Sequence, residues 1–105
     1  MTELPADMAP YRRTAMFTET TIPGGLLRAH TTKEGAWALI HVMEGSLVYR
    51  ITDPRRHAEQ LVLTPETAPG VVEPTILHEV EPVGAVRFYV EFHKAKDQAR
   101  PSSRT

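Results

Sequence analysis

The chain has 105 residues, no cysteine, 12 basic and 13 acidic side chains and a formal net charge of −1. This length allows a single domain with one core, and the missing cysteines exclude disulfides, thiolate metal sites and cysteine nucleophiles. The balanced charge gives no reason to expect a nucleic acid as partner. No segment has the apolar length of a membrane span or the pattern of a secretion signal. We therefore expect a cytoplasmic protein that binds neither nucleic acid nor membrane.

Short apolar segments separated by proline and glycine follow one another along the chain, which is typical of a β-rich fold. The predicted strands are, in chain order, residues 15–20, 25–30, 36–43, 46–52, 59–63, 71–72, 77–81 and 86–93. Glu44 and Gly45 are predicted to form a tight hairpin turn, and two further turns are expected at residues 23–25 and 82–84. The sequence thus predicts a single all-β domain, a sandwich or a small barrel, with about seven or eight short strands and little or no helix.

The two ends of the chain differ in composition from its middle. Residues 1–13 contain proline and show weak patterning, so they are expected to form an N-terminal arm. Residues 94–105 carry no apolar side chain larger than alanine and are expected to form a flexible basic tail. The folded domain should therefore cover residues 14–93.

Side-chain alternation sets two of the predicted strands apart. In residues 36–43 both faces are apolar, so this strand should be covered on both sides, with His41 among hydrophobic neighbours. In residues 86–93, Tyr89, Glu91 and His93 share a partly polar face, which points either to solvent or into a polar interior. Glu91 is the most informative carboxylate, because a charge in an apolar strand is costly unless it is paired, bound to a metal or hydrated.

Histidine is the residue type in this chain that could most readily bind a metal ion. The five histidines are His30, His41, His57, His78 and His93. Three imidazoles and a carboxylate would suit Zn, Fe, Ni or Mn, and a barrel could bring His30, His41 and His78 together. Structural explanations are also open: His30 could cap a strand, His41 could be a core residue, and His78 could pair with Glu79 at the surface. His57 and His93 are expected to be peripheral.

Four segments of the sequence carry a family resemblance: residues 21–37, 40–45, 72–82 and 86–92. In this order they resemble the small cupin-like domain family related to the TehB N-terminal domain and to YeaR, often labelled tellurite-resistance-related. The resemblance covers residues 14–93 and implies a cupin-type, jelly-roll-like β-barrel. It also implies that His30, His78 and His41 bind a divalent transition metal, with Glu91 as a ligand, a catalytic base or a group that orients a histidine.

The resemblance leads to one main functional expectation and two alternatives. The main expectation is a metal-dependent cupin that acts on a small molecule, with Glu91 as the catalytic residue and a substrate pocket formed by Trp37, Leu39, Tyr49, Phe88 and Tyr89. The first alternative is a binding or stress-response module that senses a metal, an oxyanion or a small metabolite without turnover. The second is a metal-free structural domain. A homodimer is expected from the same resemblance.

Overall fold

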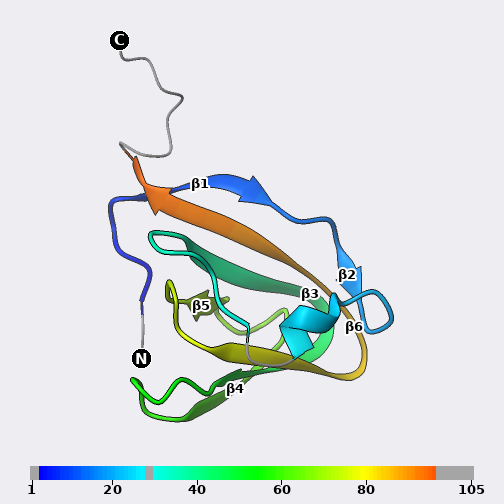
Figure 1. Ribbon diagram of the computed structural model, residues 1–105. Helices are drawn as coiled ribbons and strands as arrows, with labels where there is room; N and C mark the ends of the chain where they lie inside the picture. The colour runs from blue at the N-terminus through cyan, green and yellow to red at the C-terminus, as the bar shows by residue number, and fades with distance from the viewer. Residues whose placement is uncertain (1–2, 28–29, 97–105) are drawn as a thin grey trace.

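The fold is built on two long antiparallel strands, β3 (Trp37–Ile51) and β6 (His78–Ala95). Figure 1 shows both strands. The structure is a computed structural model, and it describes residues 3–27 and 30–96. The two strands pair from Trp37 opposite His93 at one end to Ile51 opposite His78 at the other. Because side chains alternate along a strand, this single ribbon supplies both the core and the outer face of the domain.

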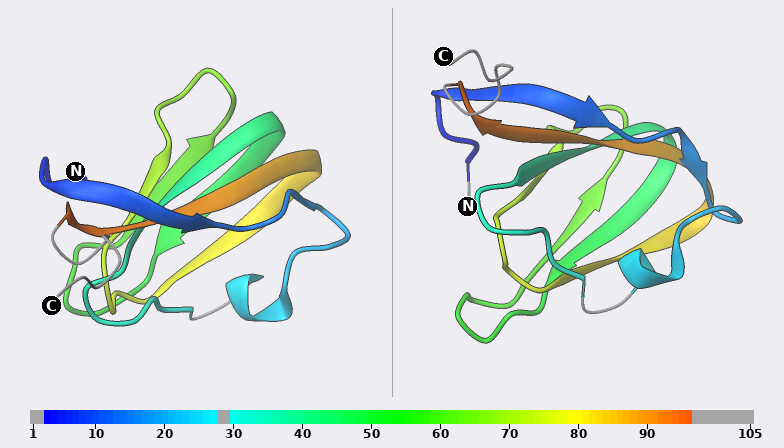
Figure 2. Two further views of the ribbon diagram at one scale, coloured as in Figure 1. Left: turned by 90° about the horizontal axis from the view of Figure 1, so that it is seen from above. Right: turned by 45° about the horizontal axis from the view of Figure 1, so that its top comes forward.

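A bulge in the middle of the ribbon replaces the predicted hairpin turn at Glu44 and Gly45. The register between β3 and β6 shifts between Val42 and Glu44 and again between Gly45 and Ser46. Gly45 has a φ of 80°, which suits a bulge as well as a turn, so glycine alone could not distinguish the two. The turn expected at residues 82–84 also lies inside a strand, β6. The ribbon bends here, and its two halves come to lie across from each other (Figure 2).

Four shorter strands pair with this ribbon. β1 (Met8–Arg13) and β2 (Phe17–Thr18) pair with β6, while β4 (Glu59–Leu63) and β5 (Gly70–Val72) pair with different halves of β3. The strand order is β1-β6-β3-β4, with β1 and β4 as the outer strands. The prediction of a single all-β domain with almost no helix is therefore confirmed. The described residues form six strands, and their sheet does not close into the jelly-roll-like barrel that was expected.

The hydrophobic core fills the space between the two halves of the bent ribbon. On β3 the residues of the core cluster change parity at the bulge, from positions 38, 40 and 42 to positions 47, 49 and 51. The extra residue in the bulge therefore keeps both halves of β3 turned toward the core. Phe88 of β6 is fully buried, and Phe17 of β2 packs against it edge-on, with ring centroids 5.6 Å apart.

Three segments differ from their sequence-based expectations or lie partly outside the described residues. Residues 25–27 of the strand expected at 25–30 belong instead to a 3-10 turn, η1 (Gly24–Leu27), and residues 28–29 of that strand are not described. β1 lies within the expected N-terminal arm, where no strand was predicted. Of the expected tail, residues 97–105 lie outside the described residues. No helix in the described ranges is long and apolar enough to cross a membrane.

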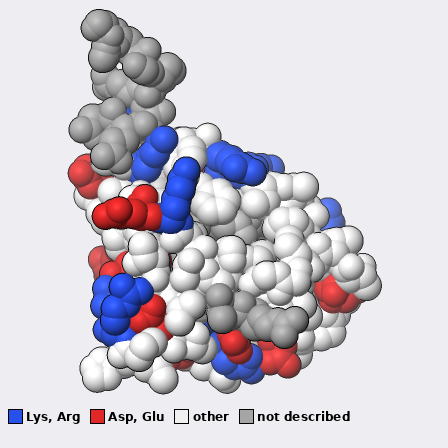
Figure 3. Space-filling view, viewed as in Figure 1, with Lys and Arg blue, Asp and Glu red and all other residues white. Residues whose placement is uncertain are grey.

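Charged side chains of both signs lie next to each other on the surface drawn in Figure 3. Several form ion pairs: Arg50 contacts Glu79 at 3.2 Å and Glu81 at 2.6 Å, and Arg56 pairs with Glu73. Exposed pairs of this kind contribute little to stability. Positive and negative side chains thus alternate on this surface, in agreement with the formal net charge of −1.

Candidate functional site

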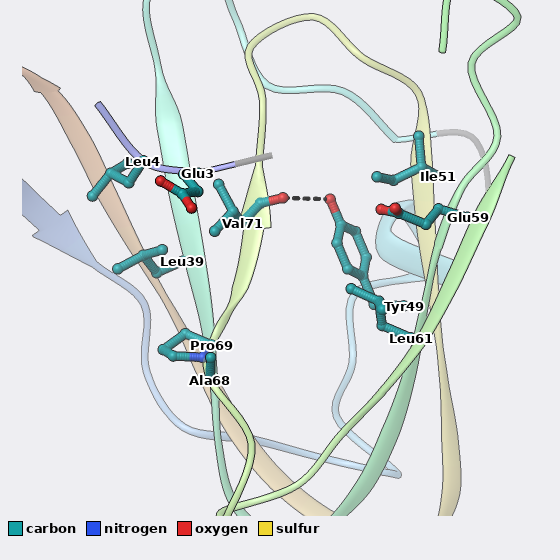
Figure 4. A pocket seen from close by; sticks show the side chains of 10 residues that line it. All are labelled: Glu3, Leu4, Leu39, Tyr49, Ile51, Glu59, Leu61, Ala68, Pro69 and Val71. Carbon is teal, nitrogen blue, oxygen red and sulfur yellow. Dashed lines mark hydrogen bonds between the residues drawn. The ribbon is translucent and has the colours of Figure 1, made fainter. Parts of the chain in front are cut away.

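A cavity of about 350 Å³ opens at the edge of the sheet where β4 and β5 separate (Figure 4). The two strands pair with different halves of β3, so the bend in β3 draws them apart and leaves a gap. Most of the lining is apolar and comes from strands or from the loop between β4 and β5. The lining residues are Leu39, Tyr49, Ile51, Leu61, Ala68, Pro69 and Val71, with Glu3 and Leu4 from the N-terminal segment and Glu59 from β4.

Tyr49 joins the two sides of this cavity. Its hydroxyl donates a hydrogen bond of 2.9 Å to the carbonyl oxygen of Val71, which links β3 to β5 (Figure 4). Burial raises the pKa of Tyr49 well above its usual range, and the nearby carboxylates of Glu59 and Glu73 raise it further. The hydroxyl therefore stays protonated and already has an acceptor, so it acts as a structural tether rather than as an acid or base.

Two carboxylates are the charged groups at the cavity. Figure 4 shows Glu3 and Glu59 on opposite sides of it, one from the N-terminal segment and one from β4. Glu3 is exposed and Glu59 is half-buried, so both can remain hydrated while the apolar walls lie between them. Such an arrangement suits a small, mostly apolar molecule whose polar part stays near the rim.

His30 and His78 form a pair at one end of the ribbon. Their backbones exchange hydrogen bonds of 2.8 and 2.9 Å, and their rings pack edge-on with centroids 5.3 Å apart. His78 is buried, and its Nδ1 lies 3.0 Å from the carbonyl oxygen of Ile76, to which it donates in the neutral ring. Burial lowers the pKa of both histidines, so both rings are neutral near pH 7.

His41 lies elsewhere, on the outer face of β3. Its Nε2 is 3.3 Å from Oε1 of Glu91, and its ring stacks on Tyr89 with centroids 4.8 Å apart. The same Glu91 oxygen lies 2.9 Å from Nε2 of His93. These contacts hold the pKa of Glu91 below its usual value, with the hydrogen bond from His93 as the largest cause. Glu91 is therefore an ionised carboxylate shared by two imidazoles.

The predicted metal site is therefore wrong. His30 and His78 lie together, but His41 belongs to a different cluster, and the described residues include no group of three His, Cys, Asp or Glu side chains arranged to hold a metal ion. The prediction of a Zn, Fe, Ni or Mn cofactor at this site is wrong for the same reason. Strand parity explains the error, since position 41 faces away from the core, whereas His78 faces into it.

The five residues predicted to line a substrate pocket are dispersed. Leu39 and Tyr49 line the cavity, whereas Phe88 lies in the core and Tyr89 stacks on His41. Trp37 pairs with His93 at the end of the ribbon, outside the cavity lining. The apolar positions of β4 and β5 are not among the site residues predicted from the sequence. Leu61 lies between polar Gln60 and exposed Val62 in the sequence. Only the pairing of β4 with β3 shows that the Leu61 side chain faces the cavity.

Comparison with known proteins gives consistent matches. A family model described as the TehB-like domain matches residues 12–90. Over 72 residues the chain is 31% identical to the probable S-adenosyl-L-methionine-dependent methyltransferase TehB of Haemophilus influenzae, a match that covers 68% of this chain and 25% of that protein. The chain thus spans about a quarter of the length of this relative.

Two solved structures share the fold. The crystal structure of TehB from Haemophilus influenzae superposes with a TM-score of 0.80 and 23% identity, covering 90% of this chain and 34% of that one. A protein from E. coli strain K12 superposes with a TM-score of 0.78 and 22% identity, covering 90% of this chain and 98% of that one. Together with the dispersed histidines, these matches overturn the expected metal-binding cupin function, because the relatives are TehB-like.

Proposed function

Because the chain belongs to the TehB-like domain family, we propose that it is a small-molecule-binding domain that serves S-adenosyl-L-methionine-dependent methyl transfer. The observation that carries the proposal is the apolar cavity between β4 and β5. In this function the domain binds a methyl acceptor or a methylated product, and the transfer itself takes place on a methyltransferase.

The size and walls of the cavity support this function. Its volume of about 350 Å³ lies in the range of small-molecule sites, which are concave, mostly apolar and built on rigid elements. Leu39, Leu61 and Val71 stand on paired strands, so the walls are preformed. A preformed site loses little conformational entropy when a ligand binds, which favours affinity even for a small molecule.

Binding can be tested by two-dimensional amide NMR of the chain. The probes are indole as an uncharged apolar molecule, S-adenosylmethionine, and S-adenosylhomocysteine, which lacks the charged methylsulfonium. We expect indole to shift the amide signals of Leu61 and Val71, and a difference between the two adenosyl compounds would report on the charge at Glu3 and Glu59. If none of the three shifts these signals, the proposal is wrong.

Variants at the cavity provide the matched control. Leu61→Trp fills the cavity and should abolish the indole-induced shifts, whereas Val62→Trp, one residue away at a position 52% exposed, should leave them intact. Ala68→Trp blocks the same cavity from an exposed loop, so it tests the site even if Leu61→Trp folds poorly. Indole binding that survives both blocking variants would place the ligand elsewhere.

The homodimer and the cytoplasmic location stay predictions beside this proposal. The homodimer is supported by the family resemblance. Size-exclusion chromatography with light scattering gives the mass of the assembly, and a monomer at all concentrations would remove the dimer from the proposal.

A further inference from the structure

A cluster of ionisable groups on the outer face of the β3–β6 ribbon is separate from the apolar cavity. At its centre, Oε1 of Glu91 lies 3.3 Å from Nε2 of His41 and 2.9 Å from Nε2 of His93. A carboxylate only accepts hydrogen bonds, so both imidazoles present their Nε2–H to it. This fixes the tautomer of both rings and leaves Nδ1 of each neutral ring as a proton acceptor.

The two histidines differ in whether Nδ1 can take up a proton. The His93 side chain is only 8% exposed, and its buried Nδ1 has no hydrogen-bond partner within residues 3–27 and 30–96. Protonation there would bury an N–H without an acceptor, which is unfavourable. The His41 side chain is 23% exposed, so its protonated ring would keep contact with water and with Glu91. His41 is therefore the more accessible of the two imidazoles.

His41 also lines a hollow of about 220 Å³ beside the β4–β5 loop. The hollow shares Ala68 and Pro69 with the apolar cavity, so the two are neighbours. The Thr67 hydroxyl donates to the Thr64 carbonyl oxygen and accepts from the Thr64 amide, which commits it to the turn. His41 is then the titratable side chain in the lining. An engineered apolar cavity of about 150 Å³ holds benzene, so one substituted ring fits here.

We propose that His41, positioned by Glu91, accepts the proton of a small weak acid of the phenol or thiol kind bound in this hollow. The O–H or S–H bond of the ligand breaks, the proton moves to Nδ1 of His41, and the electron pair stays on the ligand oxygen or sulfur. Glu91 stabilises the resulting imidazolium through Nε2–H. The inference extends the proposed function, because the electron pair set free is the one that a methyl group would be transferred to.

The charges around His41 favour this ion pair. Tyr89 stacks on the His41 ring, and the guanidinium carbon of Arg13 lies 4.5 Å from the centre of the Tyr89 ring. Arg13 pairs with Glu91 in the sheet register, so its positive charge stands beside the cluster. Glu91 and Tyr89 of β6 contact His41 directly, His93 contacts Glu91, and Arg13 of β1 contacts the Tyr89 ring. The carboxylate of Glu91 stabilises the imidazolium, whereas Arg13 packs on Tyr89 and is not among the residues that line the hollow.

The probe for this site is 4-nitrophenol, because its phenolate absorbs visible light and its phenol does not. We expect the bound probe to ionise about tenfold more readily than the free probe, seen as an excess of phenolate below the pKa of the free compound. His41→Asn should remove this excess. Glu91→Gln keeps the shape of the side chain and should reduce the excess about tenfold, the size of loss typical when a carboxylate that orients a histidine is removed.

Glu79→Gln is the matched control. Glu79 lies on the same face of β6 and its side chain is 27% exposed, against 25% for Glu91, but it pairs with Arg50. It should leave the phenolate excess unchanged. Wild-type protein that fails to bind the probe, or binds it without excess phenolate, overturns the proposal. So does a Glu91→Gln variant that folds and ionises the probe like wild type.

This result is separable from the test of the apolar cavity. If indole binds in the cavity and 4-nitrophenol is not ionised, the proton-accepting site fails and the proposed function stands. If 4-nitrophenol is ionised in a His41-dependent manner and none of the three probes binds in the cavity, the proposed function fails and the proton-accepting site stands. Should His41→Asn not fold, the NMR signal of the His41 ring in wild type decides, since the proposal requires Nδ1 to gain its proton when the probe binds.

Discussion

Gly45 lies so close to the carbonyl oxygen of Ala85 that a β-carbon added to Gly45 would stand 2.1 Å from it. Both residues belong to the region where β3 and β6 bend together. The oxygen is part of the backbone and cannot rotate away as a side chain would. The bend of the central ribbon therefore depends on a glycine at this position, both for its φ of 80° and for the missing side chain.

We expect Gly45→Ala to lower the free energy of unfolding by about 3 kcal/mol, from backbone strain together with the steric clash. Gly84→Ala is the control, because Gly84 also has a positive φ, 70°, but has open space where its β-carbon would be. It should lose about 1 kcal/mol. Urea unfolding followed by circular dichroism measures both. Equal losses would show that the close approach to Ala85 is unimportant.

Asp53 gives the domain a stability that depends on pH. Its buried carboxylate accepts hydrogen bonds from the side chain of Arg55 and from the backbone amides of Arg55 and Leu77. These bonds, with that of the Arg55 side chain largest, hold the pKa of Asp53 well below its usual range. A lowered pKa stabilises the fold above the unfolded-state pKa of about 3.9, and this contribution is lost as pH falls below that value.

Asp53→Asn should therefore lower the urea midpoint at neutral pH and flatten its fall in acid. The asparagine side chain carries no charge for Arg55 to pair with. Urea midpoints between about pH 3 and pH 7 measure both effects. Glu66→Gln, on an exposed loop, should follow the wild-type curve. An Asp53→Asn curve parallel to wild type would contradict the role of this carboxylate.

Phe88 is the largest side chain that is fully buried, and Phe17 covers it from β2. Phe88→Ala should lower the free energy of unfolding by about 4 kcal/mol, because it removes a buried ring and leaves a cavity. Phe17→Ala should lose about half as much, since Phe17 is only partly buried. Thermal unfolding of the two variants checks the order. A larger loss at Phe17 would mean that β2 carries more of the core than its burial indicates.

Tyr49→Phe removes the hydroxyl that joins β3 to β5 and leaves the ring in place. We expect a loss of about 1 kcal/mol, because the carbonyl of Val71 loses its donor. The raised pKa of Tyr49 also means that wild-type stability falls as pH rises above the unfolded-state value of about 10. The Tyr49→Phe variant should lose less stability than wild type as pH rises, because it has no hydroxyl at position 49 to ionise. Urea midpoints at neutral and alkaline pH test both statements.

The sequence predicts the β-class of this fold well and its strand boundaries less well. Proline, glycine and short apolar segments indicate an all-β domain, as found. The same glycine signal at Gly45 fits a turn and a bulge equally, and the choice depends on whether β6 can pair across it. β1 was missed because Pro10 and the polar residues around it weaken the strand pattern, while pairing with β6 overrides that weakness.

The candidate site shows the same division between local and long-range information. The sequence singled out Glu91, because a carboxylate in an apolar strand needs a partner, and the structure gives it two. It could not show that His41 and His93 are those partners, since this depends on the register between β3 and β6. The predicted grouping of His41 with His30 and His78 is wrong for a related reason. A shift of one residue along a strand turns a side chain to the opposite face of the sheet.

The pairing of β3 with β6 also decides the order in which the chain can fold. Ile51 and His78 are the partners nearest in sequence, and the hydrogen bond from Leu77 to Asp53 lies beside them. Closing this shorter loop first loses less chain entropy, after which pairing can extend toward Trp37 and His93. Stopped-flow refolding should therefore show Asp53→Asn slowing folding, and Phe92→Leu, at the far end of the ribbon, mainly speeding unfolding.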